Sequence, residues 1–251
     1  MRYRATDALA ALTEAPPDRP FVVGQLGQSL DGRIATPTGK SKYISGRRAL
    51  MHLHRLRASV DAVLVGANTV LADDPQLTVR LVDGRSPRRV VIDPSGRLPK
   101  DLRLFRAGGL SVIRDAATVD ETACAEAAAH GYEIIPLPRA EDGRIAPRAV
   151  VDALAERGLR RILLEGGSET LSHALAAGVV DVLHVMVAPI ILGSGKPGIA
   201  LPPIDELSEA AHPAAEVFAF DDGDALFVCD LRRARMAGRD DGAAGRQAAA
   251  E

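Results

Sequence analysis

The stretch ILLEGGSETL, residues 162–171, joins an apolar run to an acid, a glycine pair and a polar cluster. The apolar run is typical of a buried strand, and the residues from Ser168 onward are typical of a helix start. A carboxylate at the end of a buried strand costs free energy unless it is paired or used. Glu165 is therefore a candidate functional residue, and Gly166 and Gly167 would let a ligand approach the backbone.

A strand, a glycine turn and a helix in this order place a helix N-terminus at the carboxyl edge of a sheet. Such an end presents unpaired N–H groups and the positive pole of the helix dipole, which suits a phosphate group. The alternative is an ordinary strand-to-helix turn in which Ser168 is the N-cap. The local pattern leaves both interpretations open.

Strand-like and helix-like segments alternate on both sides of this stretch, which predicts a mixed, mostly parallel sheet with helices on both faces. We expect one α/β domain over residues 20–232, a flexible lead-in over 1–19 and a disordered tail over 233–251. Expected strands lie at 21–27, 61–66, 88–92, 110–115, 132–137, 160–165, 181–192 and 224–232, and expected helices at 46–59, 121–131, 146–158 and 168–178.

Composition excludes several classes of function. The 251 residues are 47% hydrophobic and 25% charged, with a formal net charge of −2, so we expect no nucleic-acid partner. No run approaches the roughly 20 apolar residues of a membrane span, so we expect no membrane partner and a cytoplasmic location. The two cysteines provide neither a disulfide framework nor a four-ligand zinc site.

A second candidate segment, residues 57–80, carries Arg57 and Arg80 on either side of a loop rich in hydroxyl and carboxylate groups. Two arginines in this arrangement could hold an anionic substrate through bidentate contacts. The alternative is that Asp73 and Asp74 cap backbone amides while the arginines form surface ion pairs. No histidine or further acid lies at a matching spacing, so we expect no metal site.

Two other patterns are weaker. GSGKPG, residues 193–198, matches a dinucleotide-binding string, but Pro197 and the prolines after it prevent the helix that this motif needs. We expect a surface loop there. His52 and His54 lie two apart on a predicted helix and cannot share a zinc ion; we expect one to be solvated and the other packed.

Six segments together resemble the RibD C-terminal reductase family of riboflavin biosynthesis, in a form without the deaminase half. The resemblance covers residues 21–231, and the His-x-Glu and Pro-Cys-x-x-Cys signature of the deaminase is not found. The segments are GQSLDGRIA, KSKYIS, LRASVDAVLVGANTVLADDPQLTVR, RRVVIDPSGRLP, ILLEGGSETL and GVVDVLHVMVAPIILG.

The resemblance implies a fold like that of dihydrofolate reductase, a three-layer α/β/α domain, and a homodimer. It implies a reductase that uses NADPH to convert the ribosyl group of a phosphorylated ribosylaminopyrimidine to ribityl, with hydride transfer to C1′. The residues it places on the cofactor are Gly27, Tyr43, Thr69, Asp73, Gly167, Ser168, Glu169, Thr170, Leu171, Ser172 and His173. Those it places on the substrate are Ser41, Arg57, Leu77, Arg80 and Glu165.

Two departures from the family leave the proton donor open. Many bacterial bifunctional members have Lys where this chain has Gln25, and often Trp where it has Tyr43. Glu165 could orient the substrate or act as the acid if burial raised its pKa. A pterin or dihydrofolate reductase of the same fold and a non-catalytic nucleotide-binding protein are the alternative functions.

Overall fold

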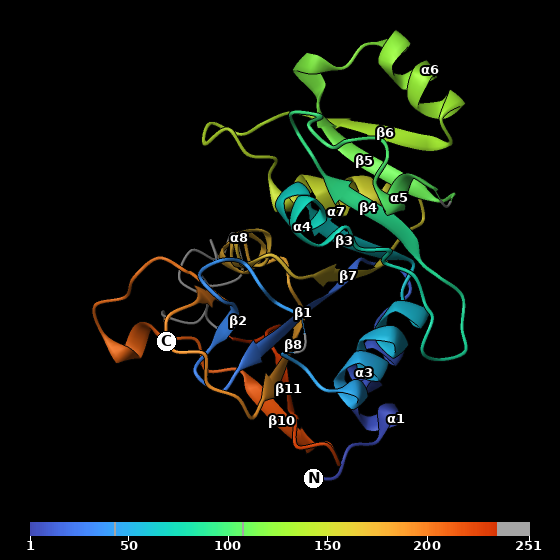
Figure 1. Cartoon of the computed structure of the whole chain (residues 1–251). Coiled ribbons are helices and arrows are strands. Elements are labelled where there is room, and N and C mark those ends of the chain that lie inside the picture. Colours follow the sequence, from blue (N-terminus) through green and yellow to red (C-terminus); the bar gives the residue numbers. More distant parts are fainter. Residues whose placement is uncertain (43, 107, 235–251) are drawn as a thin grey trace, which may run out of the picture.

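The computed structural model describes residues 1–42, 44–106 and 108–234. Its centre is a nine-stranded sheet in the order β10-β11-β8-β1-β7-β3-β4-β5-β6, with a separate two-stranded sheet β2-β9 (Figure 1). The pairings among β8, β1, β7, β3, β4, β5 and β6 are parallel, whereas β10 and β11 are antiparallel. The expected mixed, mostly parallel sheet is confirmed.

The strands are β1 (Phe21–Ser29), β2 (Arg33–Ala35), β3 (Ala62–Gly66), β4 (Arg88–Ile92), β5 (Leu110–Asp115), β6 (Tyr132–Leu137), β7 (Arg161–Glu165), β8 (Val182–Ala188), β9 (Lys196–Pro197), β10 (Ala214–Ala219) and β11 (Ala225–Asp230). The helices are α1 (Ala5–Ala8), α2 (Ala10–Thr13), α3 (Arg47–Ala58), α4 (Ala67–Asp73), α5 (Arg103–Arg106), α6 (Glu121–Ala129), α7 (Pro147–Glu156) and α8 (Ser168–Ala176). Short 3₁₀ turns follow β5 at Ala116–Thr118 and precede β10 at Leu207–Glu209.

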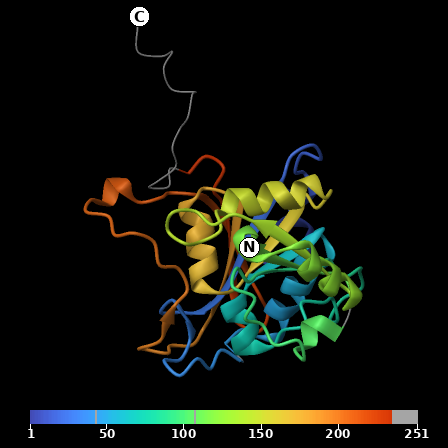
Figure 2. The same ribbon diagram turned by 90° about the horizontal axis from the view of Figure 1, so that it is seen from above.

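Helices cover both faces of the central strands, as the views in Figures 1 and 2 show. Alternate residues of β7 point to opposite faces. Leu164 packs in a core cluster with residues of α7 and α8, and Leu163 packs in a second cluster with residues of α2, α3, α4 and α5. Burial on both faces explains why strands such as β3, AVLVG, are continuous apolar runs.

The segment expected to be a flexible lead-in packs on the domain. Leu12 of α2 is buried in the core cluster on the α3 face. Tyr3 stacks on Phe220, and Arg2 forms a parallel bridge with Ala219 of the edge strand β10. Of the expected tail, residues 235–251 lie outside the described residues. None of the described helices is long and apolar enough to cross a membrane.

Candidate functional site

The glycine turn, Gly166 and Gly167, connects β7 to α8 in a conformation that suits glycine. Their φ angles are +53° and +70°, a region that side chains rarely adopt. A Cβ added to Gly167 would lie 2.6 Å from Oγ1 of Thr69, so the turn lies tightly against α4. The turn thereby fixes the start of α8 beside the start of α4.

Gly167 occupies the N-cap position of α8, and no side chain accepts a hydrogen bond there. The alternative in which Ser168 is the N-cap is therefore wrong, because Ser168 is the first helical residue. The backbone N–H groups in the first turn of α8 therefore have no side-chain acceptor at the N-cap, and they lie at the positive pole of the helix dipole. This arrangement favours an anion at the start of α8.

The large cavity, of about 860 Å³, opens at this helix start. Its walls come from β1, α4, the glycine turn, α8 and the β9 region, which meet because β1, β7 and β3 are neighbours in the sheet. The predicted site residues that line it are Gly27, Ser41, Thr69, Asp73, Gly167, Ser168, Glu169, Ser172 and His173.

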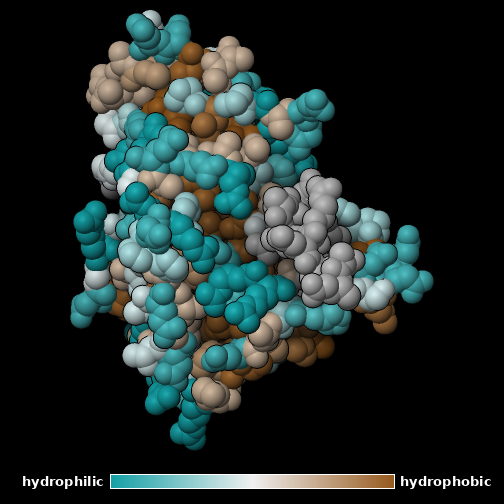
Figure 3. All heavy atoms as spheres, turned by 180° about the vertical axis from the view of Figure 1, so that it is seen from behind, coloured by the Kyte–Doolittle hydropathy of each residue, from teal (hydrophilic) through white to brown (hydrophobic). Residues whose placement is uncertain are grey.

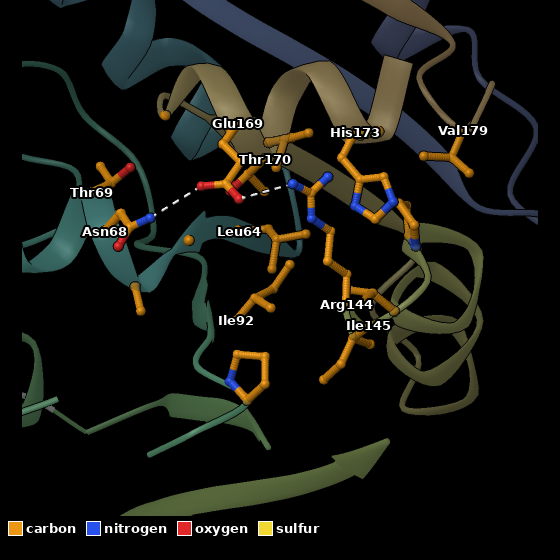
Figure 4. A pocket seen from close by; sticks show the side chains of 18 of the residues that line it. Leu64, Asn68, Thr69, Ile92, Arg144, Ile145, Glu169, Thr170, His173 and Val179 are labelled. Atoms are coloured by element: carbon orange, nitrogen blue, oxygen red, sulfur yellow. Dashed lines mark hydrogen bonds and ion pairs between the residues drawn. The ribbon is translucent and has the colours of Figure 1, made fainter. Parts of the chain in front are cut away.

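The small cavity, of about 440 Å³, adjoins the large one and is shown in Figure 4. Apolar side chains of β3, β4 and α7 line its interior, among them Leu64, Ile92 and Val150. The two cavities form one cleft that is continuous at the start of α8, since they share six lining residues. These six are Asn68, Thr69, Arg144, Gly167, Glu169 and His173.

Two of the predicted cofactor residues, Thr170 and Leu171, do not line the large cavity. Thr170 lines the small cavity only. The side chain of Leu171 is fully buried in the core on the α8 face and lines neither cavity. Tyr43 lies outside the described residues.

Glu165 forms a buried bidentate ion pair with Arg57. The Arg57 Nε and Nη2 atoms donate to the two carboxylate oxygens at 2.6 and 2.7 Å, and each side chain is 8% exposed. The remaining Nη1 atom of Arg57 donates to the carbonyl of Thr78 at 3.1 Å. The cost of burying the acid is thus met by an arginine whose own donors are engaged inside the protein.

His54 holds the loop that carries Arg80. Its Nδ1 accepts the backbone N–H of Arg80 at 2.9 Å. Burial, followed by the charges of Arg57 and Arg80, lowers the pKa of His54 to about 4. Burial and the neighbouring charge of Arg57 also lower the pKa of Arg80. Nη1 of Arg57 and Nη1 of Arg80 donate to the same carbonyl, that of Thr78, at 3.1 and 3.4 Å, so the two guanidinium groups lie on one side of the molecule.

The expectation that one of His52 and His54 is solvated is wrong. Both are buried, at 0% and 3% exposure. His52 Nε2 lies 2.9 Å from Nδ1 of His184 on β8, and its Nδ1 lies 2.9 Å from the hydroxyl of Tyr3. His52 is covered because the N-terminal segment packs on this part of α3, and His54 because the loop that carries Arg80 packs against it.

The loop between α4 and β4 contains two non-glycine residues with positive φ, Asp74 at +39° and Leu77 at +57°. Such conformations cost of order 1–3 kcal/mol and cluster at functional sites. Leu77 is buried, and Asp74 accepts the backbone N–H and Nε of Arg103, so it serves as the backbone cap that was one alternative. Asp73 instead faces Ser41, whose hydroxyl donates to it at 3.4 Å.

Three polar residues of the large cavity were not among the predictions: Asn68, Arg144 and Lys196. Lys196 lies in the GSGKPG segment, expected to be a surface loop, which instead contains β9 paired with β2. β9 runs antiparallel to β2, and its two residues, Lys196 and Pro197, line the large cavity. Across the described parts of the chain, no group of three or more His, Cys, Asp or Glu side chains could hold a metal ion.

Comparison with known proteins gives consistent results. The family model described as the RibD C-terminal domain matches residues 20–216. The chain is 39% identical to a 2,5-diamino-6-ribosylamino-4(3H)-pyrimidinone 5′-phosphate reductase of Methanothermobacter thermautotrophicus, over 76% of this chain and 89% of that protein. It is 36% identical to the riboflavin biosynthesis protein RibD of Bacillus amyloliquefaciens, over 69% of this chain but only 47% of that protein.

Solved structures agree in fold. RibD of Acinetobacter baumannii matches with a TM-score of 0.72 at 23% identity, covering 90% of this chain and 61% of that one. The riboflavin biosynthesis reductase Rib7 of Saccharomyces cerevisiae matches with a TM-score of 0.69 at 21% identity, covering 90% of this chain and 98% of that one. These matches confirm the expected fold class.

Proposed function

Because the chain belongs to the RibD C-terminal domain family, we propose that it is an NADPH-dependent reductase of riboflavin biosynthesis. Its substrate is a ribosylaminopyrimidine 5′-phosphate, whose ribosyl side chain it converts to ribityl by hydride transfer to C1′. The observation that carries this proposal is the continuous cleft, in which cofactor-side residues from four separate segments converge beside the buried Arg57–Glu165 pair.

The cleft fits a dinucleotide. The uncapped start of α8 suits its phosphates, and the apolar interior of the small cavity suits its adenosine. The large cavity, with Gly27, Ser41 and Asp73, then takes the nicotinamide end. Bound NADPH would supply the hydride, and the residues that line the large cavity would position the substrate beside it.

A preference for NADPH over NADH is supported by the basic rim of the small cavity. Ser95, Arg97 and Arg139 line it. Arg139 is fixed by Asp115 at 2.6 Å and by the Ser95 hydroxyl at 3.1 Å. Guanidinium groups bind phosphate oxygens strongly, so this rim suits the 2′-phosphate.

On the substrate side, we propose different roles for the two arginines. Arg57 donates to Glu165 and to the carbonyl of Thr78, so its role is to connect these two segments of the site. Arg80 is exposed and is the candidate that remains for the 5′-phosphate. Both oxygens of Glu165 already accept hydrogen bonds, which favours substrate orientation over proton donation.

The test is oxidation of NADPH by the purified protein, with either the diaminopyrimidinone or the aminouracil ribosyl phosphate as substrate. We expect turnover with at least one, and turnover with neither would refute the proposal. Dihydrofolate is the substrate that tests the alternative function, a pterin reductase. Arg80→Ala should reduce kcat/KM for the phosphorylated sugar about a hundredfold, whereas Arg85→Ala, which removes an exposed arginine three positions before the start of β4, should not.

We also propose that the protein is a homodimer. Phe227 of β11 pairs with Val217 of β10 and with Val185 of β8, so the three side chains share one face of the sheet. Val217 and Phe227 are 41% and 37% exposed. Figure 3 shows hydrophobic side chains exposed among hydrophilic ones on the side opposite to Figure 1. Exposed apolar surface of this kind is typical of a subunit interface.

Light scattering would test the dimer, and Phe227→Glu should dissociate it. A monomeric wild-type protein would refute it. A cytoplasmic location is supported by Cys124 and Cys229, which are both free thiols, since free thiols persist in a reducing compartment.

A further inference from the structure

Glu169 lies at the centre of a polar network where the two cavities meet (Figure 4). Its carboxylate accepts a hydrogen bond from Asn68 Nδ2 at 3.1 Å and lies 3.4 Å from Nη2 of Arg144. Asn68 in turn accepts a hydrogen bond from Nη2 of Arg97 at 2.7 Å. The network therefore connects α8, α4 and two loops across the cleft.

The carboxylate of Glu169 lies in the first turn of α8, where the helix dipole favours negative charge. A phosphate at the start of this helix would compete with it, because two anions in one place repel each other. The side chains of Arg144 and Glu169 are 53% and 61% exposed, and they make a single contact. Such an exposed pair is weak, so it can exchange partners at little cost.

Arg144 is held so that only its side chain needs to move. The loop over residues 138–146 forms an antiparallel bridge between Arg139 and Ile145. The backbone N–H of Ala140 donates to the carbonyl of Arg144 at 2.7 Å, and Arg139 Nη1 donates to the carbonyl of Gly143 at 2.9 Å. The backbone is therefore fixed beside the cleft while the guanidinium stays exposed.

We propose that Glu169 is an anionic placeholder and that Arg144 is a cofactor-binding residue. When the pyrophosphate of the dinucleotide occupies the start of α8, Arg144 and Asn68 leave the Glu169 carboxylate and donate to phosphate oxygens. The inference rests on the proposed function, and it adds a residue from a loop that no motif marks. It also separates two tasks: Arg144 acts on the pyrophosphate common to NADPH and NADH, whereas Arg97 and Arg139 act on the 2′-phosphate.

The test is the equilibrium dissociation constant of NADPH and of NADH for the full chain, measured by calorimetry. Arg144→Ala should weaken both about ten- to hundredfold and leave their ratio unchanged. Arg144→Lys should recover part of the loss. Glu169→Gln should bind both dinucleotides as tightly as wild type or several-fold more tightly. Arg157→Ala, which removes an arginine paired with Glu133 outside the cavities, should have no effect.

Three outcomes would overturn the inference. The first is an Arg144→Ala protein that binds both dinucleotides within twofold of wild type. The second is a Glu169→Gln protein that loses as much affinity as Arg144→Ala, since a placeholder cannot contribute affinity. The third is a wild-type chain that binds neither dinucleotide, which would overturn the proposed function as well; the first two would leave that function intact.

Discussion

The pairs Arg57–Glu165 and Arg144–Glu169 lie on the two sides of the glycine turn. The first is 8% exposed at both side chains and bidentate, at 2.6 and 2.7 Å. The second is 53% and 61% exposed, with one contact at 3.4 Å. The buried pair can only be a permanent part of the structure, whereas the exposed pair is free to change partners. One short turn thus separates a fixed ion pair, on the side where we propose that substrate binds, from an adaptable one, on the side where we propose that the cofactor binds.

Removing one charge of the buried pair has the largest expected effect. Glu165→Gln leaves the Arg57 guanidinium buried without a counter-charge, which should lower the free energy of unfolding by about 3–5 kcal/mol in urea denaturation. The double variant Arg57→Met with Glu165→Met removes both charges and should recover most of that loss. A loss below about 1 kcal/mol for Glu165→Gln would contradict the permanent role of the pair.

Acidic pH should lower the free energy of unfolding through His54, which lies on α3 together with Arg57. The pKa of His54 is about 4 in the folded protein, below the usual value of about 6.5 for an unfolded chain. As the pH falls, the unfolded chain therefore binds the proton first. The stability contributed by neutral His54 is complete above about pH 6.5 and is lost progressively down to about pH 4, at about 1.4 kcal/mol for each unit of pKa difference.

The measurement is the free energy of unfolding of wild type and of His54→Gln between pH 7 and pH 4. The variant should show a shallower decline, because it lacks one of the protons taken up on unfolding. Burial also lowers the pKa of His184 to about 4 and that of His52, so some decline should remain. Identical slopes would show that His54 is not the group involved.

The turn itself should show an intermediate effect. Gly167→Ala places a side chain at a φ of +70° and at 2.6 Å from Thr69 Oγ1, which should cost about 1–3 kcal/mol. Gly158→Ala is the matched control, because its φ is +78° but a Cβ there would meet nothing within 4 Å. The difference between the two variants isolates the contact with Thr69. Equal losses would mean that the turn does not depend on that contact.

The exposed pair should contribute least to stability. Arg144→Ala and Glu169→Gln should each change the free energy of unfolding by less than about 1 kcal/mol, as is usual for exposed ion pairs. The same denaturation assay would measure this. A loss above about 2 kcal/mol for either variant would place the pair in the permanent structure and remove the contrast with Arg57–Glu165.

The local sequence pattern was sufficient to predict the strand before the glycine turn and the helix after it. The apolar run before Glu165 and the helix from Ser168 follow directly from side-chain periodicity, and the resemblance placed Gly27, Thr69 and Gly167 on one ligand. All three residues line the large cavity, and their binding of one ligand stays a prediction.

Side-chain contacts between segments that lie far apart in the chain could not be predicted from local pattern. Arg57 and Glu165 are 108 positions apart, and nothing in either segment indicates that they satisfy each other rather than a ligand. Arg144 lies in a loop without a motif, and its place at the cleft depends on how the chain returns from β6 to α7. The burial of His52 depends on an N-terminal segment whose composition gave no sign of packing, and that of His54 depends on the loop that carries Arg80.

The sheet order has a consequence for how the protein is made. β1 pairs with β7 and β8 rather than with any strand that follows it closely in the chain. The part of the cleft that β1 and β7 line therefore assembles only after the ribosome has delivered β7, and closing such a long loop slows folding. A dinucleotide that binds only the finished fold stabilises it by about 2.7 kcal/mol at a hundredfold excess over its dissociation constant. A dinucleotide bound in the cleft would thus stabilise the pairing of β1 with β7, two strands that lie far apart in the chain, in the newly made protein.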